Sequence, residues 1–128
     1  MPSTRRVQMP WTTIYAKTTT GVFMPVTTFM EAPSIDRVRG TFELRALLGD
    51  LTAALAYQTC NTDSSLDSAV ALGSWATAEG FTYPTAVTDI SSATDGKQLI
   101  RFGWLVKNTS TSNQTMATVA GTIEIIVR

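Results

Sequence analysis

The segment from Gln98 to Arg128, QLIRFGWLVKNTSTSNQTMATVAGTIEIIVR, contains the two clearest strand patterns in this chain. Apolar residues occupy every even position from Ile100 to Val106, and apolar residues or glycine occupy every odd position from Ala117 to Val127. Successive side chains of a strand point to opposite faces, so each half has one apolar face. The polar run from Asn108 to Gln114 predicts a loop between them. We therefore expect a hairpin whose two apolar faces form one continuous wall of the core.

Further strand patterns precede this segment. Apolar residues and glycine alternate with charged or polar ones from Arg37 to Ala46, and the runs 52–60, 69–75 and 81–87 also favour strands. Residues 20–31 fit an edge strand broken at Pro25, because proline cannot donate to the ladder. Seven or eight short strands separated by turn-rich loops predict an all-β fold, an antiparallel β-sandwich or jelly roll.

The first 34 residues have a different composition from the rest. They hold four of the five prolines, and residues 1–30 carry Arg5, Arg6 and Lys17 without any acidic residue. Their many apolar side chains are not typical of a disordered tail. We expect residues 1–34 to form an irregular, extended N-terminal arm that docks on a partner or a sister subunit, and residues 35–128 to form the sandwich domain.

The sequence lacks the residues that most catalytic and metal sites need. There is no histidine, and Cys60 is the only cysteine, so Ser-His or Cys-His pairs and most zinc sites are excluded. No glycine-rich phosphate-binding motif occurs. We expect no enzyme activity, no cofactor and no metal, and we interpret Cys60 as a small core residue.

Charge and hydropathy restrict the partners. Ten basic and ten acidic residues cancel, which does not favour nucleic acid, whose binding relies on many phosphate contacts. No run of about 18 apolar residues predicts a membrane helix, and no apolar signal segment follows the N-terminus. We expect synthesis in a cytoplasm and no membrane partner.

Two surface features indicate binding to another protein. On the strand around Phe102, Leu99 and Leu105 point away from the core face, so the arm, a sister subunit or another partner must cover them. Aromatic and arginine residues dominate interface energies, which adds candidates from the arm. The predicted interface residues are Arg5, Arg6, Trp11, Tyr15, Lys17, Phe23, Leu99 and Leu105. A homodimer or homotrimer would hide such a surface.

The aromatic residues leave an alternative open. Small β-sandwiches often bind carbohydrate, and a sugar-stacking platform would draw on five residues: Trp11, Trp75, Trp104, Tyr57 and Tyr83. Trp104 is flanked by Phe102 and Val106 on one strand face, which favours a place in the core instead.

One spaced set of residues lies in the last third of the chain: Asp89-Ile90-Ser91, Lys97, Arg101-Phe102-Gly103, Val106 and Asn108. This set resembles small virion proteins of tailed phages. Over roughly residues 35–128 the chain looks like a jelly-roll cement (decoration) protein of phage heads. The resemblance implies a structural protein of the head surface, made in the host cytoplasm, that binds the major capsid protein and clamps neighbouring capsid subunits. The alternative function is a carbohydrate-binding module of a phage tail or receptor-binding structure.

Overall fold

The computed structural model describes residues 3–16, 20–31, 35–60, 66–77, 79–84, 88–90, 97, 99–108 and 115–127. All ten elements found there are β-strands, which confirms the predicted all-β fold. The strands are β1 (Ser3–Ala16), β2 (Val22–Pro25), β3 (Met30–Glu31), β4 (Ile35–Leu48), β5 (Leu51–Cys60), β6 (Val70–Ala76), β7 (Gly80–Pro84), β8 (Thr88–Asp89), β9 (Leu99–Asn108) and β10 (Thr115–Val127). This part of the chain contains no helix long and apolar enough to cross a bilayer.

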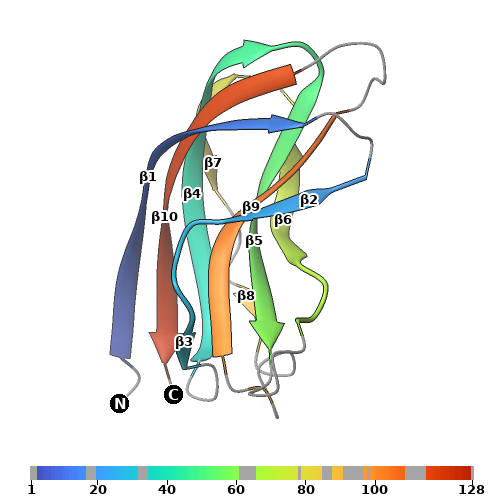
Figure 1. The fold of residues 1–128 in the computed structure, drawn as a ribbon. Helices are drawn as coiled ribbons and strands as arrows, with labels where there is room; N and C mark the ends of the chain where they lie inside the picture. Colours follow the sequence, from blue (N-terminus) through green and yellow to red (C-terminus); the bar gives the residue numbers. More distant parts are fainter. Residues whose placement is uncertain are drawn as a thin grey trace.

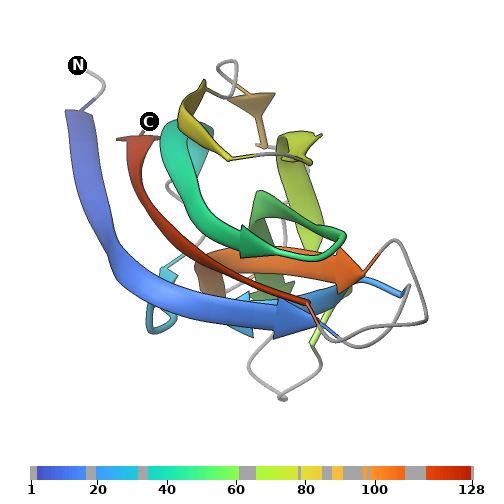
Figure 2. The ribbon, with the colours of Figure 1, turned by 90° about the horizontal axis from the view of Figure 1, so that it is seen from above.

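The strands form two antiparallel sheets that face each other as layers (Figures 1 and 2). Sheet A has the order β1-β10-β4-β7, with β8 also beside β4, and sheet B has the order β2-β9-β5-β6, with β3 also beside β9. If the two-residue strands β3 and β8 are left out, the remaining eight strands can be counted in chain order. Sheet A then contains, side by side, the first, eighth, third and sixth of these strands, and sheet B contains the second, seventh, fourth and fifth. Eight strands wound in this way form a jelly roll.

The predicted hairpin of the last two strands is wrong. β9 pairs with β5 and β2 in sheet B, whereas β10 pairs with β1 and β4 in sheet A. The apolar faces of β9 and β10 therefore meet across the sandwich instead of lying side by side. Both faces are nevertheless core, since Phe102 and Ile123 are fully buried. Alternation fixes which face of a strand is buried, but it does not determine the neighbouring strand.

The irregular conformation predicted for the N-terminal segment is wrong for residues 3–16. These residues form β1, which pairs with β10 from Ser3 opposite Val127 to Ala16 opposite Thr115 (Figure 1). The alternation of buried and exposed side chains is not visible in the sequence of β1, because a β-bulge places two residues, Pro10 and Trp11, opposite the single residue Ala120. Buried positions are odd before the bulge, at Met9, and even after it, at Ile14.

The prediction for residues 20–31 is confirmed. β2 ends at Pro25 and β3 follows at Met30, and both pair with β9 at the edge of sheet B. The run 52–60 forms β5, and Cys60 is a buried free thiol, as expected. Nearly every residue of β5 is buried, so both faces of this strand are covered. The N-terminal segment thus contributes strands to both sheets.

Candidate partner-binding surface

The outer face of sheet A presents its side chains in rows that cross β1, β10 and β4. Residues directly opposite one another on paired strands point to the same side, so the strand register defines each row. The rows run from Tyr15–Met116–Leu48 at one end to Thr4–Ile126–Arg37 at the other. Four of the seven large hydrophobic residues that the described chain exposes lie on this face: Trp11, Tyr15, Leu48 and Met116. This concentration makes the face the strongest candidate for protein binding.

The row Tyr15–Met116–Leu48 is apolar throughout, and we call it the apolar row. Its side chains are 55%, 40% and 59% exposed, respectively. Together with Thr115 they line a hollow of about 180 Å³. In β4 the row follows a bulge at Ala46, whose φ of 51° is unusual for a residue with a side chain, and the bulge turns Leu48 to the surface. Contact with a partner would remove this apolar area from water.

The row Arg6–Glu124–Arg39 lies toward the other end, and we call it the arginine row. Arg39 donates to Glu124 Oε1 from Nε at 2.8 Å and from Nη2 at 2.7 Å, and Arg6 Nε lies 3.8 Å from Oε2. The Glu124 side chain is 17% exposed, whereas those of Arg6 and Arg39 are 76% and 53% exposed. Two guanidinium groups share one carboxylate, so the row carries a net positive charge toward solvent.

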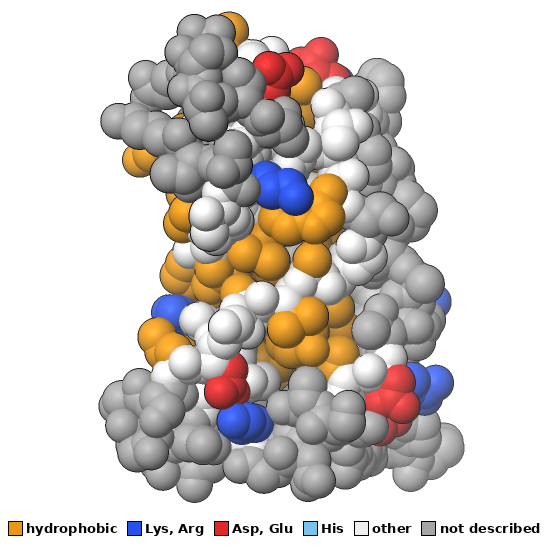
Figure 3. Space-filling view, turned by 90° about the vertical axis from the view of Figure 1, so that its right-hand side faces the viewer, with side chains coloured by type: hydrophobic (Ala, Val, Ile, Leu, Met, Phe, Trp, Pro, Cys, Tyr) orange, Lys and Arg blue, Asp and Glu red, His pale blue; other side chains and the backbone are white. Residues whose placement is uncertain are grey.

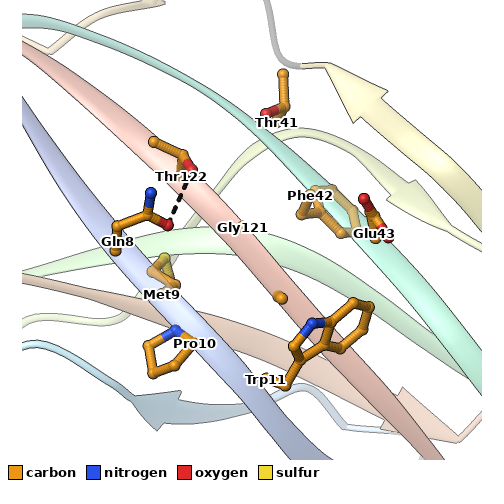
Figure 4. Close-up of a pocket in the computed structure, with 10 residues that line it drawn as sticks. Gln8, Met9, Pro10, Trp11, Thr41, Phe42, Glu43, Gly121 and Thr122 are labelled. Atoms are coloured by element: carbon orange, nitrogen blue, oxygen red, sulfur yellow. Dashed lines mark hydrogen bonds between the residues drawn. The ribbon is translucent and has the colours of Figure 1, made fainter.

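A hollow of about 290 Å³ lies between these rows, at the β-bulge, and we call it the Trp11 hollow. Gln8, Thr41, Glu43 and Thr122 contribute polar groups to its wall, and Trp11 contributes its indole (Figure 4). Thr122 Oγ1 donates to Gln8 Oε1 at 3.3 Å. The bulge is what allows both Pro10 and Trp11 to be exposed, because it places two residues opposite Ala120.

The outer side of sheet B differs, because the chain's own N-terminal segment covers part of it. Leu105 is only 9% exposed, and Phe23 of β2 lies opposite it in the ladder. Arg101 stacks over the rings of Phe29 at 4.6 Å and Phe23 at 5.7 Å, and its Nε and Nη2 donate to Gln58 Oε1 at 3.0 and 2.8 Å. Figure 3, viewed from the side of β2 and β6, shows hydrophobic side chains gathered in the middle of this surface.

The structure does not bring the five aromatic residues of the carbohydrate hypothesis together. Trp104 is fully buried, and Tyr57 is 7% exposed. Burial raises the pKa of the Tyr57 hydroxyl. Lys107 Nζ lies 4.4 Å from the ring centroid of the half-buried Trp75, and the Tyr83 side chain lies outside the described residues. Trp11 is exposed on the other sheet, so the four described side chains form no shared platform.

The eight predicted interface residues fall into separate groups. Arg6, Trp11 and Tyr15 lie together on the outer face of sheet A, and Arg5 is exposed on the same strand. Phe23, Leu99 and Leu105 belong to sheet B, and Lys17 lies outside the described residues. The list of predicted interface residues omits Leu48, Met116, Arg39 and Glu124. Only the register across β1, β10 and β4 places them beside Arg6, Trp11 and Tyr15.

Acidic groups in the described residues form no cluster with three potential metal ligands. Asp67, which lies between β5 and β6 in the sequence, has a structural role instead. Its Oδ2 accepts from Lys97 Nζ at 2.9 Å and from Thr59 Oγ1 at 2.7 Å. These two hydrogen bonds hold the pKa of the Asp67 carboxyl below its ordinary value.

Comparison with solved structures identifies the architecture. No protein-family model matches the chain, and no curated protein matches it in sequence. The chain superposes on the infectious bursal disease virus Gx strain structure (TM-score 0.71, 10% identity) and on the VP2 subviral particle of that virus (TM-score 0.71, 11% identity). The fold is that of a viral capsid jelly roll. Each alignment covers 99% of this chain and 33% of the viral one, so the chain spans about a third of those proteins' length. At this identity the likeness concerns the fold alone.

Proposed function

We propose that this protein is a structural virion protein that binds the outer surface of a tailed-phage capsid and clamps neighbouring capsid subunits. The jelly-roll fold, shared with proteins of viral particles, supports a role in the virion. The phage-like residues between Asp89 and Asn108 support the assignment to a decoration protein. The apolar row is the main support for this function, because a contiguous exposed apolar row on a sheet face is typical of a surface that binds protein.

In this proposal the apolar row contacts the major capsid protein. The 180 Å³ hollow beside Tyr15 and Leu48 is large enough for an apolar side chain of the capsid subunit. Burying these three side chains would supply the hydrophobic free energy of attachment. The protein would be made in the host cytoplasm and then reside on the head surface.

Binding to capsids that lack the protein tests this function. We expect Leu48→Asp to weaken binding at least tenfold, because an unpaired carboxylate would be desolvated in the contact. Leu66→Asp is the matched control, since Leu66 is 54% exposed against 59% for Leu48 and lies outside the apolar row. Co-sedimentation of labelled protein with capsids measures both. Equal binding of Leu48→Asp and wild type, with both folded, would reject the apolar row as the attachment surface.

A further inference from the structure

We propose that a second copy of this chain packs on the outer face of sheet A, related by a two-fold axis that runs across the strands at the row Gln8–Thr122–Thr41. This inference concerns the free protein and does not depend on the proposed function. It rests on the order of the charged and aromatic rows on this face, which is complementary to itself about that axis.

The central row Gln8–Thr122–Thr41 and the two rows beside it determine which residues of the two copies face each other. The arginine row lies on one side of the central row. The row on the other side is Trp11–Ala120–Glu43. A two-fold axis directed across the strands places each strand against its own copy and exchanges these two flanking rows. Arg39 of β4 then faces Glu43 of the second copy, and Arg6 of β1 faces Trp11 of the second copy. Each contact occurs twice.

Both contacts suit the groups that make them. Glu124 is shared by Arg6 and Arg39, so the arginine row has one positive charge in excess. Glu43 Oε2 lies at a long 3.4 Å from Arg45 Nη2, and both side chains are 41% exposed, so Glu43 can accept a further guanidinium. Arg6 is 76% exposed, and an arginine over the exposed indole of Trp11 makes a favourable cation–π contact. The Trp11 hollow supplies room for that side chain (Figure 4).

The charges also select the direction of the axis. An axis parallel to the strands would keep each row against itself and exchange β1 with β4. Arg6 would then face Arg39 of the second copy, twice, with a single carboxylate in each row. In the chosen arrangement Arg45 faces Arg37 of the second copy, which brings two like charges together. Each of these arginines has an acidic neighbour in its own chain at 3.4 Å, Glu43 for Arg45 and Asp36 for Arg37.

The size of the face predicts a weak dimer. Three strands about 4.8 Å apart and five rows spaced by two residues give a footprint on the order of 500 Å² per subunit. This is below the roughly 800 Å² per partner of a standard stable interface. We therefore expect a concentration-dependent dimer in the micromolar range.

This dimer leaves the apolar rows uncovered, one near each end. Met116 lies six residues from Thr122 along β10, or about 20 Å, so the two rows would stand about 40 Å apart. If the proposed function holds, such a dimer presents two identical capsid-binding rows, and bivalent attachment across two capsid subunits is what a clamp requires.

Exchanging the charges of one contact tests the dimer in solution, without capsids. In homodimers of Glu43→Arg, arginine would face Arg39, and in homodimers of Arg39→Glu, glutamate would face Glu43. Both variants should therefore dimerise at least tenfold more weakly than wild type. When the two variants are mixed, both contacts of the heterodimer again join opposite charges. We expect the mixture to recover dimerisation in sedimentation velocity up to about 200 μM, measured at low salt because exposed pairs are screened.

Glu31→Arg is the matched control, because it makes the same charge change at an exposed position of sheet B and should leave the dimer unchanged. Melting temperatures verify that each variant is folded, since Arg39→Glu also removes the partner of Glu124. A strictly monomeric wild type overturns the proposal. So does a mixture that associates no better than the separate variants, which would place any dimer contact elsewhere. If Leu48→Asp loses capsid binding but still dimerises, capsid attachment depends on the apolar row and dimerisation does not.

Discussion

Trp104 of β9 packs edge-on against Phe42 of β4, with ring centroids 5.4 Å apart and ring planes inclined by 67°. The two residues belong to different sheets, so this contact joins the layers of the sandwich. Gly121 makes room for the indole, because a Cβ at that position would lie 3.3 Å from Trp104 Cη2 and 2.7 Å from the carbonyl oxygen of Thr41. Large rings opposite a glycine thus fill the centre of the core.

Removing this indole should be strongly destabilising. Trp104 is fully buried, so we expect Trp104→Ala to lower the free energy of unfolding by about 3–5 kcal/mol. Trp11→Ala removes the same side chain from a site that is 53% exposed and should cost about 0.5 kcal/mol or less. Urea unfolding followed by circular dichroism gives both values. Similar losses for the two variants would contradict the assignment of Trp104 to the core.

Gly103 allows β2 to cross close to β9. A Cβ at Gly103 would collide with the carbonyl oxygen of Met24 and lie 2.7 Å from the Cα of Pro25. We expect Gly103→Ala to displace β2 and to cost about 1–3 kcal/mol, as overpacking does. Gly21→Ala is the control, since its Cβ would make only ordinary contacts of 3.6 and 3.8 Å. Faster limited proteolysis of residues 20–31 in the Gly103 variant alone would support this account, and equal rates would refute it.

The bulge in β1 predicts that two neighbouring single-residue deletions will behave differently. Deleting Pro10 removes the extra residue of the bulge and leaves Met9 and Ile14 on the core side. Deleting Thr13 instead turns Ile14 and Ala16, now 0% and 5% exposed, toward solvent. We expect the Pro10 deletion to melt within a few degrees of wild type and the Thr13 deletion to melt far lower. The reverse order in thermal melts would show that the register of β1 is misassigned.

Asp67 predicts a dependence of stability on pH. Lys97 and Thr59 lower the pKa of its carboxyl from an ordinary 3.8, so the folded state favours the charged form. The contribution is therefore complete above the unfolded-state pKa and is lost as pH falls through the lower, folded-state value. Asp67→Asn should melt below wild type at neutral pH, and the gap should close below about pH 4. A gap that stays constant from about pH 7 to pH 2.5 would exclude this role.

The candidate surface shows how far residue types alone lead. Arg6, Trp11 and Tyr15 were predicted as interface residues from their chemistry, and the structure places them on one face. Met116 and Leu48 complete the apolar row only through register with Tyr15, across three strands far apart in sequence. Leu105 was expected to need a cover, and the chain's own residues around Phe23 supply one.

The sequence by itself determined that this chain is all-β and which faces of β4, β9 and β10 are buried, because alternation with a period of two is a local property. Only the tertiary structure decided that β10 pairs with β1 and β4 while β9 joins β5 in the opposite sheet. Several strands offer similar apolar faces, so a hairpin and a jelly roll bury much the same residues. The choice between them depends on contacts between distant segments, such as Trp104 against Gly121, and no local pattern contains those contacts.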